Sequence, residues 1–177
     1  MRPADLTPVA RDVLKLPASA GLMFFSLAGA YVLEVMPWSG AWLFVRPDFV
    51  LLVLLFWAVH EPRSIGQGVA FALGLLMDVS DSMLLGQHAF AYVVAIYGAQ
   101  VLRVRILTFR LPEQTLHLLG IVIAASLVTL ILNLLLGADF PGIAYFISPV
   151  VTGFLWAPAN WILYLPAVRH RRGEAAS

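Results

Sequence analysis

The sequence predicts an all-α integral membrane protein, built as one bundle of six transmembrane helices. Of its 177 residues, 61% are hydrophobic and only 12% are charged, whereas a soluble domain is about half apolar and about a quarter charged. Lipid offers no hydrogen bonds to the backbone, so only helices or a closed barrel can span it. Long apolar runs such as residues 116–136 lack the alternation of barrel strands, which favours helices.

Turn residues and charges divide the apolar sequence into six segments. Prolines and glycines mark the turns at 37–40 and 137–142, a polar elbow occupies 60–64, and a basic loop occupies 103–113. Pro149 and Pro158 are expected to kink the last segment. The predicted segments are 19–36, 42–59, 65–77 (or a turn longer), 87–102, 115–136 and 143–168.

The second and third segments are weaker than the others. Their uninterrupted apolar runs hold only about 13 residues, which also fits a re-entrant hairpin. Counting through the flanking charged positions restores about 18 residues in each. Six spans are preferred to four on this basis.

The predicted domain organisation is one membrane domain, 19–168, with short tails at 1–18 and 169–177. The first 18 residues mix charges with three prolines. They lack the apolar core and small-residue cleavage site of a signal peptide, so a retained cytosolic tail is expected. No loop is long enough to fold as a further domain.

The basic residues set the expected orientation. With both termini in the cytosol, ten of the eleven Lys and Arg residues fall inside and only Arg46 falls outside. Positively charged residues collect in short cytoplasmic loops. The sequence therefore predicts a multi-pass membrane protein with its amino and carboxyl termini both in the cytoplasm.

The sequence lacks the residue patterns of the common catalytic and coupling sites. It has no cysteine, which excludes disulfides and thiolate metal sites. It has no Gly-rich phosphate loop, no HExxH spacing, no discernible Ser/His/Asp set and no paired intramembrane carboxylates. We expect no enzymatic activity, no cofactor, no metal and no nucleic-acid partner.

Small residues recur on one face of the third segment. Gly66, Ala70, Gly74 and Asp78 are spaced by four, so they share a helix face on which another backbone can approach closely. Packing against the second or fourth segment is the plainer interpretation. A groove for a partner helix or a ligand is the functional one.

Asp78 needs a partner more than the other residues of this face do. A carboxylate at the carboxyl end of a helix opposes the helix dipole, and it loses hydration in the membrane. Arg46 is the only cation expected on the same side. We therefore predict that Arg46 pairs with Asp78 or, failing that, with Asp48 or Asp81. A solvated acid and a snorkelling arginine form the alternative.

Two stretches resemble the MreD family of bacterial rod shape-determining proteins. They are RPDFVLLVLLFW, which begins at Arg46, and Gly66-x-Gly68 leading into FALGLLMDVSDSMLLGQHAF, which begins at Phe71. The resemblance implies a fold similar to the substrate-binding subunits of energy-coupling-factor vitamin transporters. The residues that it places in the family's signature region are Arg46, Pro47, Asp48, Gly66, Gly74, Asp78 and Gly86.

The same resemblance implies a non-enzymatic scaffold of the cell-elongation complex in the bacterial inner membrane, which supports lateral peptidoglycan synthesis and cell shape. Its partners would be the single-span protein MreC, with MreB, RodA and a class B penicillin-binding protein alongside. Docking of the MreC transmembrane helix on a groove of the bundle is the expected mechanism. A transporter substrate-binding subunit is the main alternative, and a lipid-precursor binder or flippase is a third.

Overall fold

A computed structural model of the chain describes residues 19–40, 45–82 and 85–164. Helices and the turns between them make up these residues, with no strand among them. The helices in chain order are α1 (Ala20–Val35), α3 (Phe49–His60), α4 (Gln67–Ser80), α5 (Gln87–Val101), α6 (Arg103–Thr108), α7 (Leu111–Leu135), the 3-10 helix η1 (Ile143–Phe146) and α8 (Ile147–Phe154).

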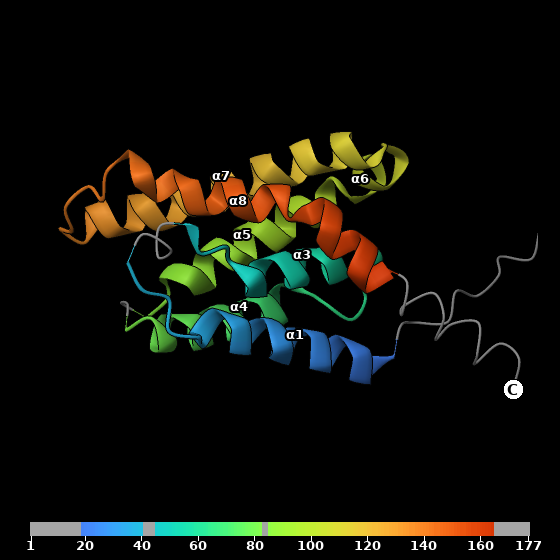
Figure 1. The fold of residues 1–177 in the computed structure, drawn as a ribbon, viewed down its shortest axis with the longest axis horizontal. Coiled ribbons are helices and arrows are strands. Elements are labelled where there is room, and N and C mark those ends of the chain that lie inside the picture. The colour runs from blue at the N-terminus through green and yellow to red at the C-terminus, as the bar shows by residue number, and fades with distance from the viewer. Residues whose placement is uncertain (1–18, 41–44, 83–84, 165–177) are drawn as a thin grey trace, which may run out of the picture.

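Helix α3 lies in the middle of the bundle (Figure 1). Nine of its 12 residues are buried, because a helix that is apolar all round has to be covered on every side. Helix α1 packs on α3, α3 packs on α5, and α4 packs mainly on α5. Helices α7 and α8 pack on each other, α7 covers α5, and α8 also contacts α3.

Four helices meet at one end of the bundle, which we call the polar end. Helices α1 and α4 finish there, and α3 and α5 begin there (Figure 1). The helix ends leave backbone N–H and C=O groups without partners inside the helices. The charged residues that the sequence marks as unusual therefore lie where such groups need partners.

Two helices are long and apolar enough to cross a membrane. They are Leu111–Leu135, with 25 residues, and the helical stretch Ile143–Tyr164, with 22. Helices α1, α3 and α4 are apolar but have 16, 12 and 14 residues, fewer than the ~20 of a straight span. The all-helical fold is confirmed, while the count of six spans and the tails at 1–18 and 169–177 stay predictions.

Two predicted boundaries in the basic loop are wrong. Residues 103–108 form helix α6 rather than a loop, and α7 begins at Leu111, four residues earlier than predicted. The start of α7 is polar, which hid it within a charged stretch. Pro112 suits a first helical turn, and the Glu113 carboxylate accepts the Arg110 N–H at 3.1 Å.

The predicted start of the second segment also changes. Helix α3 begins at Phe49, with Asp48 as its N-cap, so Pro47 precedes the helix. The predicted start at 42 falls among residues 41–44, outside the described residues. A proline has no N–H to offer, and Asp48 supplies the side-chain acceptor that a helix start needs.

The two prolines of the last segment behave differently. The helix is interrupted at Leu155, where Pro158 lacks the N–H that would bond to the carbonyl of Phe154. Pro149 lies in the first turn of α8, directly after the change from 3-10 to α-helix. An interruption is therefore found before Pro158.

The small residues of α4 differ in how closely they are packed. A Cβ atom added at Gly74 would overlap the backbone of His88 and Ala89, whereas one added at Gly66 or Gly68 meets nothing within 4 Å. Helices α4 and α5 therefore touch backbone to backbone at Gly74. The packing interpretation is confirmed at this residue.

Gly74→Ala should destabilise the bundle, because α4 and α5 would have to separate to admit one methyl group. Overpacking of this kind costs about 1–3 kcal/mol. Gly68→Ala is the matched control on the same helix, and Ala there should be neutral or stabilising, since helical Gly is worse than Ala by about 0.5–1 kcal/mol. Thermal unfolding of the purified proteins in detergent measures both changes, and equal midpoints would contradict the close contact.

Candidate functional site

The predicted site residues separate into two groups. Arg46, Pro47, Asp48, Asp78 and Gly86 lie at the polar end, where α1 and α4 end and α3 and α5 begin. Gly74 is at the α4–α5 contact. Gly66 caps the start of α4, and Ala70 is fully buried one turn further along. The structure thus brings the charged residues of the predicted site together at the polar end, and Gly66 and Ala70 lie away from them.

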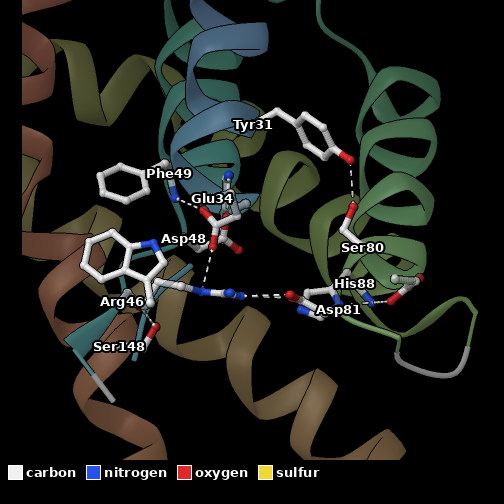
Figure 2. A network of polar contacts seen from close by, with 12 residues as sticks. Tyr31, Glu34, Arg46, Asp48, Phe49, Ser80, Asp81, His88 and Ser148 are labelled. Carbon is white, nitrogen blue, oxygen red and sulfur yellow. Dashed lines mark hydrogen bonds and ion pairs between the residues drawn. The ribbon is translucent and has the colours of Figure 1, made fainter. Parts of the chain in front are cut away.

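Arg46 holds together the ends of two helices. Its Nη2 donates to both carboxylate oxygens of Asp81, at 3.1 and 3.0 Å, and its Nε lies 3.2 Å from Oε1 of Glu34. Figure 2 shows the guanidinium between the two carboxylates. A planar guanidinium suits this bridge because its donors point along fixed directions.

The preferred pairing of Arg46 with Asp78 is therefore wrong, and of the two fallback partners, Asp48 and Asp81, the pairing with Asp81 is confirmed. Asp81 caps the end of α4 and is reachable from Arg46, while Asp78 lies about one turn deeper and is fully buried. Sequence spacing places both residues near one end of a helix. The spacing does not show which of the two carboxylates faces Arg46.

Glu34 is a site residue that the sequence reasoning did not select. Its side chain is only 3% exposed, and its Oε2 accepts the backbone N–H of Phe49 at 2.7 Å. The second oxygen faces Arg46. An acid inside an apolar run is itself a signal, and applying that signal to the first segment would have found Glu34.

Asp48 ties the start of α3 to α5 and α8. Its carboxylate accepts the Leu51 N–H at 2.7 Å, as an N-cap does, and the Tyr92 hydroxyl at 2.7 and 2.8 Å. Its own N–H donates to Oγ1 of Thr152 at 2.8 Å. Ser148 adds a second link from α8, since its hydroxyl donates to the Arg46 carbonyl at 2.6 Å.

Asp78 closes the turn between α4 and α5. Its carboxylate accepts the N–H groups of Gly86, His88 and Ala89 at 2.7, 2.8 and 3.4 Å. Nδ1 of His88 lies 2.9 Å from Oδ1. Asp78 therefore binds the positive end of the α5 dipole, which offsets its unfavourable place at the end of α4. Gly86 has a φ of +106°, which favours glycine at this turn.

A cavity of about 520 Å³ adjoins this network. The charged groups and the start of α8 form one part of its lining, and the middle of α7 and η1 form the other. The residues that line it include Glu34, Arg46, Asp48, Asp81, His88, Tyr92, Ser126, Thr129, Tyr145, Ser148 and Thr152. The volume is within the range of small-molecule sites.

The described carboxylates do not gather in the way that a metal centre requires. Within residues 19–40, 45–82 and 85–164, no three His, Asp or Glu side chains are placed to hold a metal ion. Glu34, Asp48 and Asp78 each accept at least one backbone N–H instead. The site as built joins helix ends to one another.

The fold and the site together define a helical bundle with two membrane-length helices and an internal polar network at one end. Comparison with known proteins gives the family. A sequence model described as "rod shape-determining protein MreD" matches residues 16–169, so the chain belongs to the MreD family. The predicted family is thereby confirmed.

One relative is the rod shape-determining protein MreD of Haemophilus influenzae. It is 36% identical over 76 residues, which cover 43% of this chain and 46% of that protein. The matched region thus spans just under half the length of the relative. No solved structure matches the chain, and the similarity to energy-coupling-factor subunits stays a prediction.

Replacing Arg46 by Ala should leave the buried carboxylate of Glu34 without a cationic partner. Removing one partner of a fully buried ion pair costs about 3–5 kcal/mol, and we expect about 2 kcal/mol here because a quarter of the Arg46 side chain is exposed. The double variant Arg46→Ala with Glu34→Gln should regain stability, since glutamine carries no charge and still accepts the Phe49 N–H. Thermal unfolding of both variants tests this, and a double variant less stable than Arg46→Ala would argue against a stranded charge.

Asp78→Ala should be more damaging than the loss of an exposed carboxylate. Three N–H groups lose their acceptor, and each stranded donor costs about 1–3 kcal/mol, so we expect a loss of about 3 kcal/mol. Asp78→Asn keeps one acceptor oxygen and should fall between Asp78→Ala and the wild type. Chemical unfolding in mixed micelles measures the series, with Asp139→Ala as the exposed control. A loss no larger than that of the control would show that Asp78 does not hold the turn.

Proposed function

We propose that this protein is a non-enzymatic scaffold of the bacterial cell-elongation complex. It binds an MreC-like single-span membrane protein and supports lateral peptidoglycan synthesis and the maintenance of cell shape. RodA, a class B penicillin-binding protein and MreB are the further members of the assembly in this proposal. Membership of the MreD family supports the role in rod shape.

The observation that carries the proposal is the way the protein uses its polar groups. At the polar end, the described carboxylates and Arg46 bond to helix ends and to one another. A bundle tied in this way offers other proteins its apolar helix faces. Such a protein is suited to holding partner helices.

Helix α4 provides the face that we propose for the partner helix. Its buried side packs on α5 at Gly74, and its opposite side is exposed. Gly68 and Ala72 lie four residues apart on the exposed side, where small residues let a second helix come close. The larger exposed apolar residues around them are Val69, Phe71, Leu76 and Val79.

The proposed setting is the inner membrane, crossed six times, with both termini in the cytoplasm. The distribution of Lys and Arg supports this orientation. It puts the polar end on the outer side of the membrane. Helices α1, α3, α4 and α5 would then cross with the help of flanking turn residues, because each is shorter than a straight span.

A substrate-binding subunit of a small-molecule transporter is the second candidate, and the cavity is the observation that favours it. The resemblance implies that such subunits dock their energising module through small residues on the first helix. Here the corresponding residues, Ser26 and Ala30, are already in use or buried: Trp57 donates to the Ser26 hydroxyl at 2.8 Å, and Ala30 is 5% exposed. A flippase has less support, since Arg46 is held between two carboxylates.

The proposed function predicts that the exposed small residues of α4 are needed for partner binding. Gly68→Leu with Ala72→Leu should abolish co-purification of the MreC-like protein from detergent extracts and should round the cells, because the bulky residues hold the partner helix away. Cell shape is scored by microscopy after replacement of the native gene.

The control is the pair Gly120→Leu with Ala124→Leu, at the same spacing on the exposed side of α7. It should leave both readouts unchanged. Loss of binding in this pair alone would move the docking face to α7. Rod-shaped growth of a strain without the protein, or tight retention of a vitamin, would contradict the scaffold function itself.

A further inference from the structure

The cavity beside the polar end carries more negative than positive groups. Three carboxylates line it, those of Glu34, Asp48 and Asp81, against one guanidinium, that of Arg46. Arg46 is shared between Glu34 and Asp81. His88, the remaining basic residue in the lining, directs its Nδ1 to Asp78 at 2.9 Å.

Among the described residues, Asp48 is the carboxylate of the cavity that forms no ion pair, and Arg46 and His88 act on it only at longer range. The Leu51 N–H and the Tyr92 hydroxyl donate to it, and a carboxylate has about four acceptor positions. A buried carboxylate without a direct ion-pair partner is costly. A cation in the cavity would remove that cost and fill the remaining positions.

The opposite side of the cavity is suited to an organic molecule rather than to a bare ion. Ser126, Thr129 and Tyr145 place hydroxyl-bearing side chains there, beside Val122 and Ala125. The Tyr145 hydroxyl donates to the Ser126 carbonyl at 2.9 Å, which fixes this wall to α7. The volume of about 520 Å³ is also far larger than a single ion needs.

We propose that this cavity binds a molecule with a primary ammonium group, which sits against Asp48, while the rest of the molecule lies along the α7 and η1 wall. An ammonium has three N–H donors and no acceptor, so it complements a carboxylate with free acceptor positions. The inference goes beyond the scaffold function and does not depend on it. The ammonium can come from a lipid headgroup or from a free amine, since the recognition chemistry is the same.

The test uses the full-length protein in nanodiscs. For the lipid source, native mass spectrometry counts phosphatidylethanolamine retained from an equal mixture with phosphatidylglycerol. For the free source, calorimetry measures the Kd of ethanolamine in nanodiscs of phosphatidylglycerol alone. We expect selective retention of phosphatidylethanolamine, a measurable Kd for ethanolamine, or both.

Three variants make the test specific for the cavity. Asp48→Asn removes the charge and should weaken binding at least tenfold, while Asp139→Asn, an exposed carboxylate outside the cavity, should leave it unchanged. Ala144→Phe fills the cavity from η1 without altering its charge. It should also weaken binding at least tenfold, and it decides the matter if Asp48→Asn does not fold.

The outcomes separate cleanly. Binding in either arm that is lost in Ala144→Phe and kept in Asp139→Asn supports the site, and the arm identifies the source of the ammonium. Equal retention of both lipids together with no ethanolamine binding would overturn the proposal. So would amine binding that survives both Asp48→Asn and Ala144→Phe.

Discussion

The structure depends on hydrogen-bond partners, other than water, for the backbone groups at the helix ends. At the polar end, the starts of α3 and α5 present N–H groups that no turn of helix precedes. Glu34, Asp48 and Asp78 accept them, each from a different place in the chain. Glu34 and Asp78 each bond to the start of another helix, and Asp48 caps its own. These carboxylates therefore also fix how the helices are arranged.

This arrangement explains why so many charges occur in so apolar a chain. A carboxylate that is surrounded by N–H donors and an arginine is stable in a site where an isolated one is not. The network thus combines two constraints, since helix starts need acceptors and buried acids need donors. The cavity lies where the network has acceptors to spare, on the side that faces α7.

Sequence reasoning predicts the local features well, and it predicts contacts between residues far apart in the sequence poorly. Apolar runs and turn residues locate the main helices, and the four-residue spacing finds the contact at Gly74. The partner of Arg46 is missed because Asp78 and Asp81 are both near the end of α4, and only the packing of α4 on α5 turns Asp78 toward Gly86. Glu34 is missed because its acceptor role depends on Phe49, which a turn brings back beside it. Such pairings are set by the three-dimensional arrangement and leave no fixed spacing in the sequence.

The bond between Asp78 and the start of α5 has a consequence for how the protein enters the bilayer. An aspartate in an isolated apolar helix raises the free energy of insertion, by about 2.5–3.5 kcal/mol at the centre of the membrane and less toward its edges. That cost falls when α5 already donates its first N–H groups to Asp78. In the proposed six-span topology, insertion of α4 and α5 as a preformed hairpin would therefore be favoured over insertion one helix at a time, and the backbone contact at Gly74 gives that hairpin its tight crossing. In that topology, α4 would gain its stable place in the membrane only after α5 has been synthesised.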